Sequence, residues 1–320
     1  MGNDSSPIIL LTAQLDETQR ARILEAAPAA RIVSEQDLAA QPDLVPRVEI
    51  AYPRLPSELW SRARGLRWLQ SSFAGVDGLL ANPEARSHPA VFTNVHIHVH
   101  CLSEHLWGMA LMLVRNLHGS VRIQQSAHWD TAAVSGNLGT LAGGTLCVAG
   151  LGAIGRHCAA IGRLMGMRVI GISRSGRADP AVDQVVTPDK RRDAFAASRL
   201  VMLLLPGTEE TRGFVGKAEM DVLRDAWLVN GGRGTAVDTD ELVRALQDGR
   251  VRGAGLDVTE PEPLPDRHPL WSLPNVVISP HYGGNHPGYE DESLEVFCSN
   301  LRRWTRGEPL EFVVDKSKGY

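Results

Sequence analysis

Three side chains suited to acid–base catalysis and anion binding lie in predicted loops of the C-terminal half of this chain. Arg233 occurs in the segment NGGRG, Glu262 in TEPEPLP and His281 in SPHYGG. A guanidinium can hold the carboxylate and the keto oxygen of a 2-keto acid in a fixed fork. An imidazolium can protonate that oxygen as hydride arrives at carbon, and a carboxylate beside it can orient the ring. The three types together suit keto-acid reduction, although each alone could be a helix cap, a surface carboxylate or an ordinary loop histidine.

A glycine-rich turn upstream predicts a dinucleotide site. Gly150, Gly152 and Gly155 form the pattern G-x-G-x-x-G between a predicted strand and a predicted helix. The first glycine permits a tight turn, the second lets the backbone approach a pyrophosphate, and the third lets the helix pack on the strand. Ala153 and Ile154 begin the helix, whose N-terminus supplies N–H groups and a positive dipole end. A turn that serves packing alone is the alternative, and the strand–turn–helix context favours the dinucleotide.

The end of the next predicted strand indicates which dinucleotide binds. NAD sites normally carry Asp or Glu here to hold the ribose 2′-hydroxyl. This chain has Ser173 and Arg174, with Arg177 close by. A carboxylate repels a 2′-phosphate, whereas a hydroxyl and a guanidinium bind it. We therefore predict that NADP(H) is preferred and that NAD(H) is possible; the alternative is that the arginines are solvated loop residues.

The elements that must position these residues alternate between short apolar runs and helical patterns, which predicts parallel sheets covered by helices. Strands are expected at 8–11, 48–52, 68–71, 91–93, 145–149, 168–172, 200–205, 227–230, 254–258 and 276–279. Helices are expected from Asp16, as the cap, to about residue 26, and at 57–63, 101–117, 154–165, 240–247 and 288–304. Thr239 is the expected cap of the helix at 240–247.

Length and composition allow a large core and argue against several partners. The 320 residues, 43% of them hydrophobic and 22% charged, are comfortable for two globular domains. A net charge of −4 without blocks of like charge argues against nucleic-acid binding. The most apolar helical run, 106–114, is far shorter than the roughly 20 residues of a membrane span, and the N-terminus does not read as a signal peptide. The scattered cysteines 101, 147, 158 and 298 predict free thiols in a reducing cytoplasm.

Several segments resemble the D-isomer-specific 2-hydroxyacid dehydrogenases. They are SSFAGVDGLL, VAGLGAIGR, LLLPGTEETRGFV, LVNGGRGTAVDTDELVRALQDGRVRGAGLDVTEPEPLP and NVVISPHYGG, within a stretch from about Trp68 to Trp304. The resemblance implies an α/β fold of two Rossmann-like domains, each a doubly wound parallel sheet, with the active site in the interdomain cleft. A discontinuous, flavodoxin-like substrate domain would comprise residues 1–98 and 286–320, and the dinucleotide-binding domain residues 99–285.

The same resemblance implies a role for each matching residue. Arg233 would bind the substrate carboxylate and carbonyl, and Glu262 and His281 would be the acid/base pair. Asp257 would form a hydrogen bond with the nicotinamide carboxamide. Gly75 and Val76 would offer backbone N–H groups to the substrate carboxylate. Pro206 and Thr211 would lie along the cofactor. The long helix from about Cys101 to Leu117 would pack against a second subunit, so a homodimer is expected.

Two features depart from the commonest family pattern. Ser173 replaces the acidic ribose residue, and with GISRSG it resembles the glyoxylate/hydroxypyruvate reductase branch. The alternating histidines 96, 98 and 100 could bind a metal if extended on one face. Our interpretation is an interdomain hinge with polar side chains and no metal, because no further ligand cluster is evident.

The sequence determines the residues that contact the substrate less closely than those that bind the cofactor. Tyr52, Arg54 and Phe73 could line the cleft, with Arg54 recognising a second acidic group, or could be ordinary loop packing. The leading hypothesis is reduction of glyoxylate, hydroxypyruvate or a similar 2-keto acid by NADPH. Alternatives are oxidation of phosphite or another small anion within the same family, or a dinucleotide-sensing, corepressor-like scaffold, because fold does not determine function.

Overall fold

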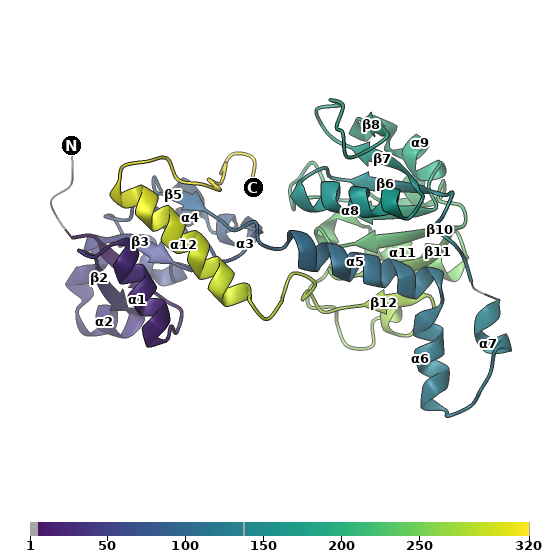
Figure 1. The fold of residues 1–320 in the computed structure, drawn as a ribbon, viewed down its shortest axis with the longest axis horizontal. Coiled ribbons are helices and arrows are strands. Elements are labelled where there is room, and N and C mark those ends of the chain that lie inside the picture. Colours follow the sequence, from purple (N-terminus) through teal and green to yellow (C-terminus); the bar gives the residue numbers. More distant parts are fainter. Residues whose placement is uncertain (1–5, 137, 320) are drawn as a thin grey trace. The chain divides into compact units, whose positions relative to one another are not determined.

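The computed structural model describes residues 6–136 and 138–319. The chain divides into two compact units, one of Met1–Ile97 with His286–Tyr320 and the other of His98–Asn285. Each contains a parallel sheet, so the α/β prediction is confirmed (Figure 1). The two units are described separately below as unit 1 and unit 2.

Unit 1 is built on a five-stranded parallel sheet in the order β2-β1-β3-β4-β5. The strands are β1 (Ile8–Leu11), β2 (Arg31–Ser34), β3 (Val48–Tyr52), β4 (Trp68–Gln70) and β5 (Val91–Thr93). Helices α1 (Glu17–Ala26) and α12 (Tyr289–Thr305) pack side by side on one face; α2 (Glu35–Ala40), α3 (Asp77–Leu80) and α4 (Pro83–Ser87) pack on the other. β1 is buried along its whole length because both faces of the sheet are covered.

Unit 2 holds a seven-stranded parallel sheet in the order β12-β11-β10-β9-β6-β7-β8. The strands are β6 (Thr145–Ala149), β7 (Arg168–Ile172), β8 (Gln184–Val186), β9 (Leu200–Leu203), β10 (Ala226–Asn230), β11 (Val251–Leu256) and β12 (Val276–Ile278). The helices are α5 (Val99–Val114), α6 (Leu117–Gln125), α7 (Ala132–Ser135), α8 (Ala153–Leu164), α9 (Arg191–Ala196), α10 (Lys217–Met220) and α11 (Thr239–Gln247).

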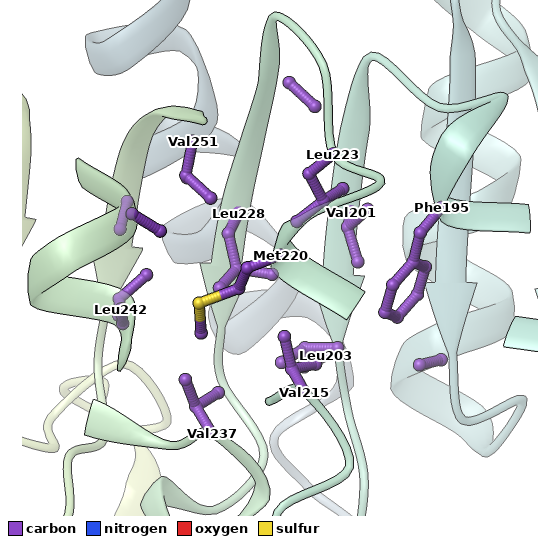
Figure 2. Close-up of a cluster of buried hydrophobic side chains, with 14 of the residues drawn as sticks. Phe195, Val201, Leu203, Val215, Met220, Leu223, Leu228, Val237, Leu242 and Val251 are labelled. Atoms are coloured by element: carbon purple, nitrogen blue, oxygen red, sulfur yellow. The ribbon is translucent and has the colours of Figure 1, made fainter. Parts of the chain in front are cut away.

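Two apolar layers hold the helices of unit 2 on the sheet. Side chains of α5 and α8 pack on one face around Trp107 and Trp227. Figure 2 shows the other face, where Phe195 of α9, Met220 of α10 and Leu242 of α11 lie over the strands. Each fully buried side chain of this size contributes about 1.5–3 kcal/mol relative to exposure, so these layers dominate the stability of the unit.

Several predicted elements differ from the structure. The helix predicted at 57–63 is only a 3₁₀ turn over Ser57–Leu59. The helix predicted to reach Leu117 ends at Val114, because Asn116 adopts a left-handed backbone with φ 49° and α6 starts afterwards. α11 is capped by Asp238, whose carboxylate accepts the Glu241 N–H, and not by Thr239. β2 and β8 were not predicted, whereas the Asp16 cap of α1 is confirmed.

The described part of the chain contains no helix long and apolar enough to cross a membrane. None of its cysteines forms a disulfide; Cys147, Cys158 and Cys298 are buried, and Cys101 is partly exposed. Burial raises the pKa of the Cys158 and Cys298 thiols to about 11, which keeps them protonated near neutral pH.

Candidate active site

The glycine turn joins β6 to α8 where the strand order of the sheet reverses, between β6 and β9. Open α/β sheets bind ligands beyond the carboxyl ends of the strands at such a point. Gly150 has φ 102°, and a Cβ there would lie 2.4 Å from the Leu204 carbonyl oxygen. A Cβ on Gly155 would lie 2.0 Å from the Gly150 carbonyl oxygen. The turn and the close helix packing therefore require the first and third glycines, as the pattern predicts.

The middle glycine leaves the N-terminus of α8 approachable. Gly152 is the N-cap residue, it forms no side-chain cap hydrogen bond, and a Cβ built on it meets nothing within 4 Å. The first-turn N–H groups of this helix thus have no capping side chain, and the positive end of its dipole faces open space. These features fit the pyrophosphate of a dinucleotide.

The loop after β7 carries the residues predicted to bind the ribose phosphate. The Ser173 N–H donates to the Val186 carbonyl oxygen over 3.0 Å, and Gly176, with φ 60°, closes the turn. The Arg174 guanidinium is exposed and forms an ion pair with Glu210, with Nη1 3.1 Å from Oε2. Arg177 is also exposed and forms no ion pair within residues 6–136 and 138–319. Two cations therefore lie on one turn at the carboxyl end of β7, as a phosphate site requires.

The turn after β9 lies on the other side of the glycine turn in the strand order. The Thr211 hydroxyl lies 2.5 Å from the Pro206 carbonyl oxygen and accepts the Thr208 N–H over 3.0 Å. Thr211 therefore shapes this turn. That Pro206 and Thr211 also lie along the cofactor stays a prediction.

Arg233 follows β10 in a tightly packed loop. The Asn230 side chain is buried, donates to the Arg233 carbonyl oxygen over 3.0 Å and accepts the Gly232 N–H over 3.1 Å. A Cβ on Gly234 would lie 1.9 Å from the Thr259 carbonyl oxygen, so only glycine fits there. The Arg233 Nη1 donates to the Gly232 carbonyl oxygen over 2.8 Å. The loop thus holds a partly buried guanidinium at the carboxyl end of the sheet.

His281 and Glu262 are in direct contact. The His281 Nδ1 is hydrogen-bonded to the Glu262 Oε1, and the two side chains are 46% and 39% exposed. His281 has φ 53°, a left-handed backbone region that non-glycine residues seldom adopt. Its N–H donates to the Asp257 carbonyl oxygen over 2.9 Å, which holds the backbone in this conformation. Because Nδ1 is engaged, Nε2 is the ring nitrogen available to a reacting oxygen.

Asp257 organises the loop that carries His281. Its buried Oδ1 accepts the Ser279 hydroxyl over 2.6 Å and the N–H groups of Tyr282 and Gly283 over 3.2 and 3.1 Å. His105 of α5 completes the cluster, with Nε2 2.7 Å from the Ser279 Oγ and 3.5 Å from the Asp257 Oδ1. The carboxylate therefore has a structural task, and its hydrogen bond to a nicotinamide carboxamide stays a prediction.

A pocket of about 250 Å³ lies in unit 1, beyond the carboxyl ends of β3 and β4. It is lined by Pro53, Arg54, Leu69, Ser71, Phe73, Gly75, Gly78 and Leu79. The Arg54 side chain is 70% exposed, and the nearest carboxylate oxygen among the described residues is 3.9 Å away on Glu35. Phe73 is 62% exposed. A cation and an aromatic ring thus line the same pocket. That Arg54 and Phe73 contact the substrate stays a prediction.

Two neighbouring backbone N–H groups adjoin this pocket. Within the part of the chain that the structure describes, the N–H groups of Gly75 and Val76 donate to no other group. The loop before them is held by Asn94, whose Nδ2 donates to the Ala74 carbonyl oxygen over 2.7 Å. Paired N–H groups on a fixed loop are a suitable anion site, consistent with the expected substrate carboxylate.

The prediction that Tyr52 lines the substrate site is wrong. Its side chain is only 4% exposed, its ring stacks on Phe297 of α12 at 4.5 Å, and its hydroxyl lies 3.1 Å from the Ser293 Oγ. The alternation of β3 turns this residue toward the α1 and α12 face, opposite to Ala51.

The three alternating histidines have different neighbours. His96 packs on Phe312 at 4.7 Å, His98 Nδ1 lies 3.1 Å from the Gly284 carbonyl oxygen, and His100 meets His157 edge-on at 4.8 Å. Within the described ranges no cluster of three or more His, Cys, Asp or Glu residues could hold a metal ion.

Comparison with known proteins supplies the family. Residues 107–283 match the model of the D-isomer specific 2-hydroxyacid dehydrogenase, NAD binding domain. The chain belongs to this family. It is accordingly an NAD(P)-dependent D-2-hydroxyacid dehydrogenase by family, with a nicotinamide dinucleotide as its cofactor.

Individual relatives agree with this family. A crystal structure of a family member from Aeromonas salmonicida is 34% identical, covers 98% of this chain and 100% of that chain, and has a TM-score of 0.83. An NADPH-dependent glyoxylate/hydroxypyruvate reductase from Sinorhizobium meliloti, solved with NADP and sulfate, is 26% identical with 99% and 100% coverage and a TM-score of 0.83. A glyoxylate reductase from Aeropyrum pernix is 32% identical over 71% of this chain and 70% of that protein.

The structure of this dehydrogenase brings some predicted residues together and adds others. Glu262 touches His281, and Arg233, Asp257 and His281 follow the neighbouring strands β10, β11 and β12. Sequence reasoning missed Ser279, His105 and Glu210. For His105 a signal existed, because it lies three residues after Leu102 and four before Met109, within the apolar stripe of α5.

Proposed function

We propose that this dehydrogenase reduces a small 2-keto acid, such as glyoxylate or hydroxypyruvate, to the D-2-hydroxy acid with NADPH. The observation that carries the proposal is the hydrogen-bonded His281–Glu262 pair, at the same sheet edge as Arg233 and the glycine turn. The names of the Sinorhizobium meliloti and Aeropyrum pernix relatives support the substrate class.

Each residue has a task that its chemistry allows. A bound reduced nicotinamide supplies the hydride. Glu262 holds the imidazole through Nδ1, so that His281 Nε2 delivers the proton to the carbonyl oxygen. Arg233 binds the substrate carboxylate and polarises the carbonyl, because a guanidinium donates in a fork. The Gly75 and Val76 N–H groups bind the carboxylate as well.

The preference for NADPH rests on the loop after β7. Ser173, Arg174 and Arg177 supply a hydroxyl and two guanidinium groups where NAD sites carry a carboxylate. The 2′-phosphate of NADP is a strong acceptor for such donors.

We further propose a homodimer that binds neither nucleic acid nor a membrane, and a cytoplasmic location. The dimer was expected through the Cys101–Leu117 helix, yet half of α5 is buried within its own unit. The apolar side chains exposed beyond it, Leu117, Val121 and Trp129, lie on α6 and the loop after it. These side chains support residues 117–129, called the arm below, as the contact.

The decisive experiment follows loss of NADPH and NADH absorbance with glyoxylate, hydroxypyruvate, pyruvate and phenylpyruvate. We expect turnover with NADPH and either glyoxylate or hydroxypyruvate. Tight NADPH binding without turnover on any of them would contradict the proposed substrate, and phosphite would be tried next. Protein partners captured by such an inert chain would instead favour the scaffold alternative.

A variant tests the acid/base assignment. We expect His281→Asn to lower kcat by roughly 100- to 10,000-fold, the usual contribution of a general acid. Asparagine tolerates the positive φ of this position, so the loop should keep its shape. NADPH affinity, measured by nicotinamide fluorescence, should change less than about twofold. Near-normal turnover would remove His281 from the chemistry.

A further inference from the structure

An exposed ion pair connects the two loops that flank the glycine turn. Arg174 follows β7, Glu210 follows β9, and these strands lie on either side of β6 in the sheet. The Arg174 Nη1 lies 3.1 Å from the Glu210 Oε2, and the side chains are 57% and 70% exposed. The proposed ligand of the 2′-phosphate is thus paired with a carboxylate of the chain itself.

Glu210 is presented to Arg174 by a turn that is held by several hydrogen bonds. The Thr211 hydroxyl contacts the Pro206 carbonyl oxygen and the Thr208 N–H, and Arg212 N–H donates to the Thr208 carbonyl oxygen over 3.0 Å. The neighbouring Glu209 is 89% exposed and pairs with Arg212 at 3.6 Å. Two adjacent carboxylates therefore serve different partners, and only Glu210 reaches the loop after β7.

We infer that Glu210 limits the discrimination of this site between NADP(H) and NAD(H). The inference rests on the proposed function, in which Arg174 binds the 2′-phosphate. An NADP molecule has to exchange the Arg174–Glu210 pair for an Arg174–phosphate pair, and the Glu210 carboxylate then faces a phosphate of like charge. NAD carries a hydroxyl at this position, so the ion pair persists when NAD binds.

The strengths of the two interactions favour this exchange, but repulsion between Glu210 and the phosphate remains. An exposed ion pair contributes little stability, because water and salt screen it. A phosphate carries about two negative charges and accepts charge-assisted, bidentate hydrogen bonds, so it displaces the carboxylate. The repulsion that remains corresponds to about a three- to tenfold loss of NADPH affinity at low salt, from Coulomb's law in a highly screened setting.

The test measures direct binding of NADPH and NADH to the intact chain by calorimetry. We expect Glu210→Gln to lower the Kd for NADPH by about three- to tenfold and to change the Kd for NADH by less than about twofold. Glu209→Gln removes the same charge one residue away and should leave both constants within about twofold. The gain in Glu210→Gln should shrink as salt is added, because ions screen the repulsion.

Other results would overturn the inference in distinguishable ways. Weaker NADPH binding in Glu210→Gln would mean that Glu210 orients Arg174 for the phosphate, and weaker NADH binding would mean that it accepts the ribose hydroxyl. Equal changes of the NADPH Kd in Glu210→Gln and Glu209→Gln would mean that the effect comes from net charge alone. The variant Arg174→Ala distinguishes failure of the inference from failure of the proposed function. If Arg174→Ala weakens NADPH binding while Glu210→Gln changes neither Kd, only the inference fails. If the wild type prefers NADH and Arg174→Ala changes neither constant, the proposed cofactor and the inference both fail.

Discussion

At the scale of single residues, His281 shows how the fold maintains an unfavourable conformation for chemistry. A non-glycine residue with positive φ costs on the order of 1 kcal/mol or more. Here the Asp257 carbonyl oxygen binds its N–H and Glu262 binds its Nδ1. The backbone and the ring are therefore each held by a hydrogen bond, which limits the motion of the nitrogen that would transfer a proton.

Tyr52 provides a residue-scale prediction about pH. Burial raises the pKa of its hydroxyl to about 12, and the hydrogen bond with Ser293 acts in the opposite direction. Between about pH 10 and pH 12 the unfolded chain loses this proton while the folded chain keeps it. The free energy of unfolding therefore falls as the pH rises through this window.

The variant Tyr52→Phe tests this sign. At pH 8 it should be less stable by roughly 1–3 kcal/mol, because the buried Ser293 hydroxyl loses a partner. The deficit should narrow or reverse at pH 11, where only the wild type carries the titrating phenol. Urea unfolding at both pH values measures the difference. The variant Tyr282→Phe, at a residue that is 49% exposed, controls for loss of a phenol. A constant deficit would contradict the assignment.

At the scale of elements, three neighbouring parallel strands bring the catalytic candidates to one edge. Strands in a sheet lie about 4.8 Å apart, so loops after β10, β11 and β12 are neighbours whatever their sequence distance. The loop after β12 is held to α5 by the cluster of His105, Ser279 and Asp257. A helix far upstream in sequence therefore helps to position His281.

Ser279→Ala tests this positioning role. Removing the hydroxyl deletes the hydrogen bonds of Ser279 with His105 and Asp257, while Tyr282 and Gly283 still bind the carboxylate. We expect kcat to fall by roughly tenfold to a hundredfold through misplacement of His281, while the Kd for NADPH stays within about twofold. Ser279→Thr should restore most of kcat. Ser272→Ala, which removes a hydroxyl from an exposed serine, is the matched control. A loss of thermal stability with unchanged kcat would leave Ser279 a structural residue only.

At the scale of the whole molecule, unit 2 carries an arm that its own core does not cover. None of the nine residues of α6 is buried, and Trp129 after it is 93% exposed. Exposed apolar patches of this kind are typical of protein–protein contacts. This arm, more than α5, is where we place the proposed dimer contact.

Sedimentation velocity tests the dimer. We expect the wild type at twice the 34.8 kDa of one chain. The double variant Leu117→Asp, Val121→Asp should sediment as a monomer, because two buried charges at an interface cost several kcal/mol. Leu164→Asp, on a residue of α8 that is 89% exposed, should not change the mass. A wild-type monomer, or a double variant that stays dimeric, would contradict the contact.

Features that depend on local spacing followed from the amino-acid sequence. The parallel α/β class came from alternating apolar runs and helical patterns, the need for Gly150 and Gly155 from their place between strand and helix, and the α1 cap from Asp16. The loop residues Arg233, Glu262 and His281 were found from side-chain chemistry and motif. Each motif spans only a few residues, so a short window of sequence contains it.

Only the tertiary structure decided which distant residues meet. No spacing relates Ser279 to His105 or Arg174 to Glu210, since these pairs form only when strands and helices pack. The side on which Tyr52 lies was likewise open, because both faces of its sheet are covered and both accept an apolar ring. Local sequence determines an element and its ends, whereas long-range contacts depend on the free energy of packing the whole chain, which no short window contains.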